Sequence, residues 1–390
     1  MCPYPMIYLD YNATTPLAAE AREAMLPFLA EQYGNPSSAH RLGRAAREAV
    51  DRARRQVAAL LGAEPDEILF TSGGTESNNL ALKGVAFASP PGTTTDGLRP
   101  GHLVISAIEH PAVTEPAAFL ARLGWQMTVV AADRQCLVDP SAVAAALRDD
   151  TRLVSIMHAN NEIGVIQPIR AISDICRARG VLVHTDAAQS VGKVPVDVNV
   201  LGVDLLSIAG HKLYAPKGVG ALYARRGTRL EPLLHGAGHE SGRRAGTENV
   251  PYLVALGRAA ELAVATLDET AARMATLRDR LYERLRAVVG AGLSVNGAGA
   301  PRLPNTLSVN FPKVAGDELL ARAAELCAST GAACHAGHTR LSATLAAIGL
   351  DPNVARGTVR LSLGRSTTAA EIDRAAELLC AAWRQCIRQG

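Results

Sequence analysis

The sequence lacks the features that mark membrane, nucleic-acid-binding and signal-bearing proteins. It contains no uninterrupted apolar run of about 18 residues, the length that crosses a bilayer. Lys and Arg number 40 against 37 Asp and Glu, and a net charge of +3 is too small to track a phosphate backbone. The first residues, Met-Cys-Pro-Tyr-Pro, lack the charged-then-apolar order of a signal peptide. We therefore expect a cytoplasmic protein whose partners are neither membranes nor nucleic acids.

Cysteine and lysine are both scarce. The seven cysteines are odd in number and scattered, which argues against a disulfide framework and leaves one open to a chemical role. Only five lysines stand against 35 arginines. A lysine retained where arginine is the usual choice suggests a role for its amine.

The order of apolar segments predicts an α/β protein. At 390 residues, with 48% hydrophobic and 20% charged residues, the chain is long enough for two or three globular domains. Short apolar runs alternate with segments of helical periodicity, a pattern typical of a mostly parallel sheet wrapped by helices. The expected strands are 67–70, 102–106, 127–130, 152–157, 181–185, 204–209 and 220–224.

A change of pattern after about residue 255 predicts a second domain. One long helical run over roughly 252–288 is followed by two strand segments and then by helix, strand and helix. We expect a large α/β domain over residues 16–255. A smaller α+β domain would comprise residues 256–390 together with residues 1–15.

A glycine-rich turn follows the first of these strands. Residues 71–75, Thr-Ser-Gly-Gly-Thr, lead into an apolar helix, so Gly74 and the Thr75 hydroxyl lie at a helix N-terminus. Such a turn can hold a phosphate, although plain helix capping is its commoner role. The spacing fits neither the dinucleotide nor the Walker pattern.

Two further polar groups end neighbouring strands. Asp186 follows one strand and Lys212 the next, 26 residues later, and the carboxyl ends of parallel strands are where α/β sites form. A buried ion pair is the structural alternative for these two residues. A phosphate cradle, an acid for a pyridinium nitrogen and a lysine for an imine link are together what pyridoxal 5′-phosphate (PLP) requires.

With these motifs the chain resembles the cysteine desulfurase and selenocysteine lyase family, within the class V aminotransferases of PLP fold type I. The resemblance extends over almost the whole chain. It implies an α/β fold with a large PLP-binding domain and a small domain that carries a catalytic cysteine loop. The matching segments are 8–16 (YLDYNATTP), 34–38 (GNPSS), 70–78 (FTSGGTESN), 109–110 (EH), 159–164 (ANNEIG), 186–189 (DAAQ), 210–212 (GHK), 244–247 (RAGT), 331–334 (GAAC) and 360–368 (RLSLGRSTT).

The resemblance implies roles around the cofactor ring. Lys212 would carry PLP on its amine and later move the substrate Cα proton. Asp186 would keep the ring nitrogen protonated, and Gln189 would hydrogen-bond the ring oxygen O3′. His110 would stack on the ring and take part in proton transfer, although an isolated histidine at this position is more often a helix-start or core residue.

Other matches imply phosphate contacts. Gly74, Thr75 and His211 would bind the phosphate. Members of the iron–sulfur type often have Ser-Gly-His-Lys where this chain has Ala209 before Gly-His-Lys, and Ser207, on the same strand face, is a candidate replacement. Thr247 resembles a residue that reaches the phosphate of a partner subunit, which implies a homodimer.

The remaining matches concern the substrate. Asn161, also placed at the cofactor, and Arg360 would hold the α-carboxylate, for which the planar Arg fork is suited. A purely structural, ion-paired Arg360 is the alternative. Cys334 would be the nucleophile, with His335 favouring its thiolate. These two and His338 do not make a plausible metal site, because no fourth ligand is near in sequence.

The expected reaction converts L-cysteine to L-alanine and leaves a persulfide on Cys334. Its sulfur would pass to an acceptor in iron–sulfur cluster or tRNA-thiolation pathways. The alternative is a selenocysteine lyase, favoured by the likeness of residues 331–335, 302–306 and 364–368 to animal lyases. Those lyases tend to have an acidic residue after the ring-stacking histidine, whereas here Pro111 follows His110. Transamination or β-elimination without a persulfide, and a non-catalytic binding protein, are further alternatives.

Overall fold

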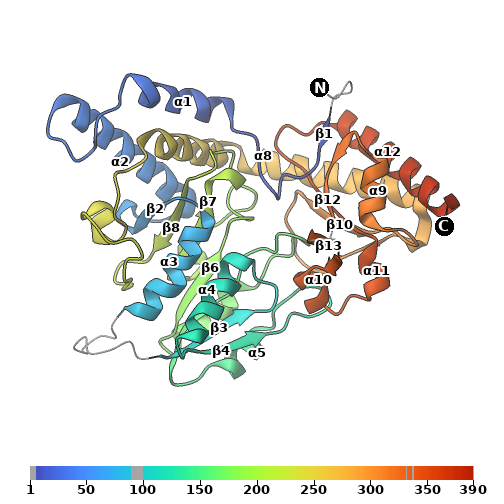
Figure 1. Ribbon diagram of the computed structural model, residues 1–390, viewed down its shortest axis with the longest axis horizontal. Coiled ribbons are helices and arrows are strands. Elements are labelled where there is room, and N and C mark those ends of the chain that lie inside the picture. The colour runs from blue at the N-terminus through green and yellow to red at the C-terminus, as the bar shows by residue number, and fades with distance from the viewer. Residues whose placement is uncertain (1–5, 89–99, 331, 336–337, 390) are drawn as a thin grey trace.

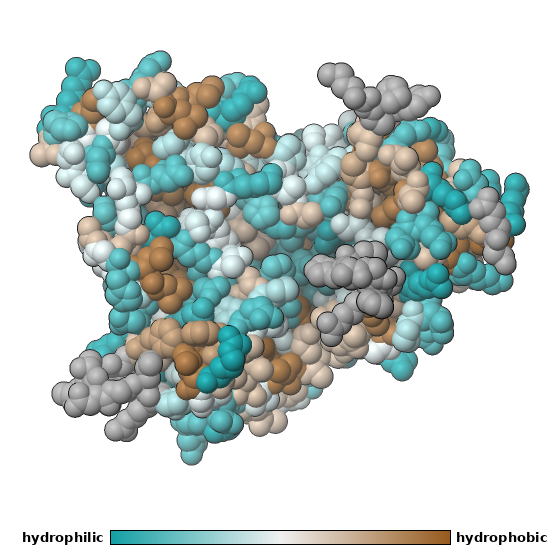
Figure 2. All heavy atoms as spheres, in the orientation of Figure 1, coloured by the Kyte–Doolittle hydropathy of each residue, from teal (hydrophilic) through white to brown (hydrophobic). Residues whose placement is uncertain are grey.

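The computed structural model describes residues 6–88, 100–330, 332–335 and 338–389. The protein has two lobes joined by one long helix, and the N- and C-termini lie on the smaller lobe (Figure 1). On the face shown in Figure 2, apolar residues are scattered among polar ones, as on most folded proteins.

The large lobe is built on a seven-stranded sheet, and it confirms all seven predicted strands. The order is β2-β8-β7-β6-β5-β3-β4, and only β8 runs antiparallel to its neighbours. Most of its strands are buried on both faces, as expected when helices cover a sheet on both sides. The bounds are β2 Ile68–Thr71, β3 His102–Ser106, β4 Gln126–Val130, β5 Thr151–Ser155, β6 Leu182–Asp186, β7 Leu205–Ala209 and β8 Gly220–Ala224.

Alternate side chains of the strands enter two different cores. Leu69 of β2 packs in one core with α3 and α4, whereas the adjacent Phe70 packs in the other with α2. Helix α3 begins directly after β2, so its N-terminus lies at the edge of the sheet where the polar motifs also lie. The helices of this lobe are α1 Ala19–Ala30, α2 Arg41–Leu61, α3 Gly74–Phe87, α4 Pro111–Arg122, α5 Pro140–Ala146, α6 Ile169–Arg177 and α7 Val198–Leu201, with short 3-10 turns at Pro65–Glu67 (η1), Gly210–Lys212 (η2) and His239–Gly242 (η3).

The connecting helix α8 spans Val250–Val289, 40 residues. Its first part packs through Leu253 and Leu256 in the core of the large lobe that also holds Phe70. Its last part packs through Leu281 and Leu285 in the core of the small lobe, called the small core below. The expected domain boundary at residue 255 therefore falls inside an unbroken helix. Among the described helices, α8 alone is long and apolar enough to cross a membrane by length and composition, but here it is a core helix shared by both lobes.

The small lobe contains a four-stranded antiparallel sheet, β12-β15-β10-β9, covered by α9, α12 and the end of α8. The N-terminal strand β1 pairs in parallel with β11, and Leu9 is fully buried in the small core. The bounds are β1 Ile7–Tyr8, β9 Ser294–Val295, β10 Thr306–Asn310, β11 Leu326–Cys327, β12 Ser329–Thr330, β13 Ala332–His335, β14 His338–Leu341, β15 Thr358–Ser362, α9 Gly316–Arg322, α10 Ala343–Ala347, α11 Pro352–Arg356 and α12 Ala369–Gln389, with a 3-10 turn η4 at Gly290–Gly292.

Replacing Leu281 by Ala is expected to lower the free energy of unfolding by about 3 kcal/mol, because it opens a cavity at a fully buried position of the small core. Urea denaturation measures the loss. The control is Val288→Ala on the same helix, where the side chain is 36% exposed and the cost should stay below about 1 kcal/mol. Equal effects of the two substitutions would contradict the placement of the small core on α8.

Candidate active site

A cavity of about 480 Å³ opens where the strands of the large sheet end and the small lobe begins. This volume suits a cofactor-sized molecule. Most sequence-predicted site residues line it, and they come from the loops after β5, β6 and β7, the starts of α3 and α4, and strand β15. The lining residues are Asn12, Ala13, Gly74, Thr75, Asn78, His110, Ala112, Met157, Ala159, Asn161, Asp186, Ala188, Gln189, Ala209, His211, Lys212 and Arg360.

Asp186 is the buried acid of this cavity. It ends β6 and is 6% exposed. The Asn78 amide donates to its Oδ2 at 2.7 Å, and the Ala188 N–H donates to its Oδ1 at 2.9 Å. These bonds fix the carboxylate at the cavity wall, where it can pair with a cationic ring nitrogen.

Lys212 follows β7 in the 3-10 turn η2. Its Nζ donates to the main-chain oxygens of Asn12 and, at 2.7 Å, of Ala13. Burial and then the charge of Arg360 lower the pKa of Lys212 to about 8, against the opposite effects of Asp10 and Asp186. The ion pair between Lys212 and Asp186, the structural alternative, is absent from the contacts of the described residues. A lysine amine with a lowered pKa is a better nucleophile and base near neutral pH.

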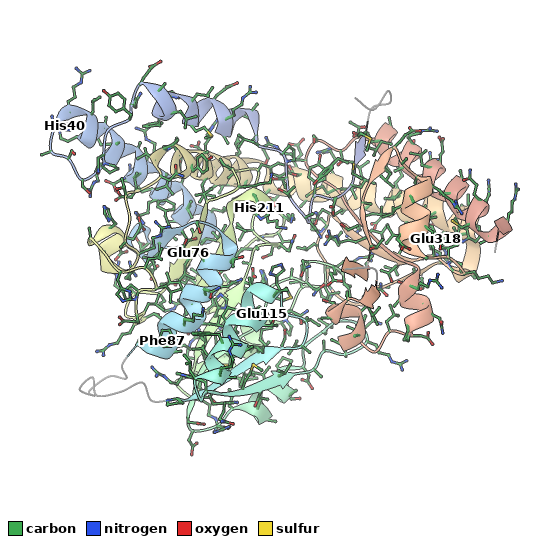
Figure 3. The ribbon with its side chains drawn as sticks, in the orientation of Figure 1. His40, Glu76, Phe87, Glu115, His211 and Glu318 are labelled. Carbon is green, nitrogen blue, oxygen red and sulfur yellow. The ribbon has the colours of Figure 1, made fainter. Side chains whose placement is uncertain are left out.

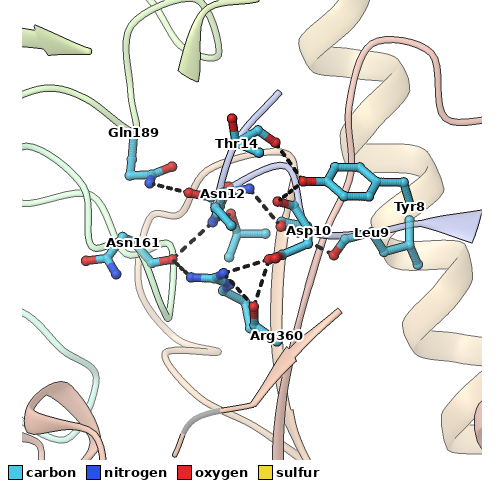
Figure 4. Close-up of polar contacts among 12 residues, drawn as sticks. Tyr8, Leu9, Asp10, Asn12, Thr14, Asn161, Gln189 and Arg360 are labelled. Atoms are coloured by element: carbon cyan, nitrogen blue, oxygen red, sulfur yellow. Dashed lines mark hydrogen bonds and ion pairs between the residues drawn. The ribbon is translucent and has the colours of Figure 1, made fainter. Parts of the chain in front are cut away.

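Asn12 is the site residue that the sequence analysis missed as a separate contributor. It is 1% exposed, and its main-chain oxygen accepts from Gln189 Nε2 at 3.0 Å as well as from Lys212 (Figure 4). Its signal lies in segment 8–16, one of the segments that carry the family resemblance.

The start of α3 supplies free backbone N–H groups for an anion. Gly73 adopts φ +148, a conformation that favours glycine, and Gly74 lies so close to β7 that an added Cβ would come within 3.1 Å of the Ala209 Cβ. Thr75 lies in the first turn and lines the cavity. The N-terminal dipole of this helix favours a phosphate.

His211 lies in the middle of the molecule (Figure 3). Its Nδ1 shares a hydrogen bond of 3.1 Å with the Thr14 hydroxyl. Burial and then the neighbouring lysine charges, first that of Lys212, lower the pKa of His211 to about 4. The imidazole is therefore neutral at pH 7 and can serve an anion only as a hydrogen-bond donor.

The structure does not place Ser207 in the cavity. Its hydroxyl is fully buried and shares a hydrogen bond of 3.0 Å with His184 Nε2, whose Nδ1 is bonded to Ser155. Ser207 precedes Ala209 by two residues of β7, which puts it about 7 Å deeper in the sheet. The expected replacement of the missing serine contact is therefore wrong in position.

His110 lines the cavity and also starts a helix. It is the N-cap of α4, and its Nδ1 accepts from the Ala112 N–H at 3.1 Å. Desolvation lowers the pKa of His110, while Asp186 raises it. The cap fixes the imidazole at the cavity wall and confirms the helix-start interpretation, whereas stacking on a cofactor ring stays a prediction.

Glu109 lies directly behind His110 and is buried. Its Oε1 accepts from the Met157 N–H at 2.8 Å and from the Ser106 hydroxyl at 2.5 Å, whereas its Oε2 has no hydrogen-bond partner. Burial raises the pKa of Glu109 to about 8. The group is thus largely protonated at neutral pH, which keeps a second negative charge away from Asp186.

Arg360 reaches the cavity from strand β15 of the small lobe. Its Nη2 donates to Asp10 at 2.7 Å and to the Ser329 hydroxyl at 3.0 Å, and its Nη1 donates to the Asn161 main-chain oxygen at 3.0 Å. Its Nε is buried without a partner. The expected structural ion pair exists, but an unpartnered donor remains beside the cavity.

Besides Ser207, two predicted site residues are not among the described residues that line this cavity. Thr247 is exposed in the loop before α8. Cys334 lies in the antiparallel pair β13–β14, opposite Thr339, and its side chain, like those of His335 and His338, is outside the described part of the structure. Within the described residues, no group of three His, Cys, Asp or Glu side chains could hold a metal ion.

The residues present fit PLP by the chemistry of their donor groups. An acid, a lysine with a lowered pKa and a helix N-terminus face one cavity. The acid suits the ring nitrogen, the lysine the aldehyde carbon and the helix N-terminus the phosphate.

Glu109→Gln is expected to stabilise the cofactor-free protein increasingly as the pH rises. The folded state holds the Glu109 proton up to a pKa of about 8, whereas the unfolded state releases it near its ordinary value, so wild-type stability falls between these two pH values. The advantage of the variant should grow by about 3 kcal/mol from pH 5 to pH 7. Urea denaturation at both pH values tests this, with the exposed Glu115→Gln as control, and a constant difference would contradict a protonated Glu109.

The comparisons with known proteins agree with this donor set. The family described as Aminotransferase class-V matches residues 7–375. "Cysteine desulfurase IscS" of Dictyoglomus turgidum is 46% identical over 375 residues, which cover 96% of this chain and 93% of that protein.

Two solved structures are similar over nearly their whole length. A "NIFS-LIKE PROTEIN" is 38% identical with a TM-score of 0.88, covering 96% of this chain and 98% of its own. "SspA in complex with cysteine" is 36% identical with a TM-score of 0.80, covering 93% and 99%. The chain belongs to the aminotransferase class-V family, as a PLP-dependent enzyme of fold type I.

Proposed function

We propose that the protein is a cysteine desulfurase, which converts L-cysteine to L-alanine and transfers the sulfur to an enzyme thiol. One observation carries the proposal: Asp186, Lys212 and Arg360 line one cavity with the N-terminus of α3. The relative named as a cysteine desulfurase and the neighbour described with bound cysteine support the choice of substrate.

Different cavity residues act on different atoms of the cofactor and substrate. When bound, PLP supplies an electron sink for charge that develops at the substrate Cα. Asp186, fixed by Asn78, holds a proton on the ring nitrogen, and Gln189 donates to the ring oxygen. Lys212 has a pKa of about 8, so a useful fraction of its amine is neutral at physiological pH and can take the Cα proton.

Arg360 and Asn161 receive the substrate carboxylate. Asp10 and Ser329 hold the guanidinium in place, and its Nε is left with an unmet hydrogen bond. A carboxylate bound there would satisfy that donor, which favours an amino acid over an amine as substrate.

Cys334 receives the sulfur. Its thiolate, favoured by the adjacent His335, attacks the sulfur of the substrate and forms the sulfur–sulfur bond of the persulfide. The bond between Cβ and sulfur breaks, its electron pair stays on Cβ, and a proton taken up there completes the methyl group of alanine. The persulfide then passes to an acceptor protein in iron–sulfur cluster or thiolation pathways. We place this reaction in the cytoplasm, where thiols stay reduced.

The enzyme works as a homodimer in this proposal. Thr247 lies in an exposed loop outside its own cavity, which is the arrangement expected of a residue that reaches the phosphate in a partner subunit.

Cys334→Ala is expected to abolish alanine release from L-cysteine while the protein keeps the yellow colour of bound PLP. Alanine should be measured from L-cysteine and L-selenocysteine side by side under reducing conditions. Cys327→Ala, a cysteine of β11 away from the cavity, is the matched control and should retain activity.

The same assay separates the alternatives. Release of alanine from L-selenocysteine alone would make the enzyme a selenocysteine lyase. Sulfide or keto-acid formation that survives Cys334→Ala would indicate elimination or transamination. A wild-type protein that stays colourless at saturating PLP would overturn the whole assignment.

Arg360→Lys is expected to raise KM for L-cysteine by about tenfold or more, with PLP binding unchanged. Lysine keeps the charge beside Asp10 but cannot offer the planar fork that binds a carboxylate. Steady-state kinetics measure KM, and the absorbance of bound PLP reports the cofactor. Arg365→Lys, which changes an arginine paired with Glu20 outside the cavity, is the control. An unchanged KM in the Arg360 variant would assign that residue a purely structural role.

A further inference from the structure

A second lysine, Lys193, is buried beside the active site without a role in the proposed reaction. It is 5% exposed, and no carboxylate pairs with it among the described ion pairs. Its Nζ donates to the main-chain oxygen of Gln189 at 3.0 Å and to Gln189 Oε1 at 3.1 Å. Both hydrogen bonds therefore go to a single residue, and that residue lines the cavity.

These contacts determine which way the Gln189 amide faces. Below its pKa of about 7 Lys193 is protonated and can only donate, so the amide oxygen faces Lys193 there. On the other side the main-chain oxygen of Asn12 can only accept, so the amide nitrogen must face Asn12, as it does at 3.0 Å. The flipped amide would set oxygen against oxygen and nitrogen against ammonium. One Gln189 N–H is thereby left free.

We infer that Lys193 is a positioning residue, which locks the Gln189 amide so that its free N–H serves the oxygen of the cofactor ring. The inference rests on the proposed PLP site. Lys193 itself touches neither cofactor nor substrate and acts only through Gln189.

Burying the Lys193 amine costs desolvation free energy, which argues that the amine has a role. Burial, followed by the charges of Lys212 and Arg360, lowers the pKa of Lys193 to about 7. An aliphatic side chain of similar length would fill the space without that desolvation cost. Such a side chain would leave Gln189 Oε1 without its donor and the amide free to turn.

Lys193→Met tests the inference, because Met fills the space but cannot donate. The dissociation constant of PLP from the cofactor-free protein should rise about tenfold, the effect of one lost buried hydrogen bond. The absorption maximum of the bound cofactor should shift in the same direction as in Gln189→Ala. Lys313→Met, at an exposed lysine of the small lobe, should change neither value.

A double-mutant cycle with Gln189→Ala separates positioning from other roles. If Lys193 acts through Gln189, adding Lys193→Met to Gln189→Ala leaves PLP affinity unchanged. Additive losses would overturn the inference, as would wild-type affinity in Lys193→Met. Should the Met variant not fold, Lys193→Leu, which also cannot donate, takes its place with the same expectations. A wild-type protein that binds no PLP would instead refute the proposed function.

Discussion

The carbonyl and side chain of Asn12 form the contact on which the two lobes and the site both depend. From the large lobe, Lys212 and Gln189 donate to its main-chain oxygen. From the small lobe, Asn305 donates to the Oδ1 of Asn12. The side-chain and main-chain N–H groups of Asn12 donate in turn to the hydroxyls of Thr306 and Ser362. Because a single buried residue joins both sets, movement of the N-terminal segment would disturb Lys212 and the lobe interface together.

The charges around the cavity favour the binding of anions. Burial and the charges of Lys212 and Arg360 lower the pKa of Lys193, and burial and the charge of Arg360 lower the pKa of Lys212. Asp10 and Asp186 offset only part of this positive charge. An anionic cofactor and a substrate carboxylate would supply the rest, so the electrostatics of the cavity suit anionic ligands.

Sequence periodicity predicted the sheet well because each strand is short, apolar and bounded by turn residues. The same reasoning brought Asp186 and Lys212 together, since parallel strands end at one edge. It failed for the position of a residue along its strand and for the extent of a helix. Ser207 shares a strand face with Ala209 but is buried and does not line the cavity, and the helical pattern of α8 gave no sign of passing from one core to the other. The contacts of Asn12 join residues almost 300 positions apart, beyond any local pattern.

Structural and functional interpretations of the site residues prove compatible. His110 caps α4 through its Nδ1, Arg360 pairs with Asp10, and Gln189 is held by Lys193 and Asn12. Each bond restrains a side chain before any ligand arrives, so less conformational entropy is lost on binding. The hydrogen bonds that stabilise this edge of the fold are thus the same ones that aim its free donors into the cavity.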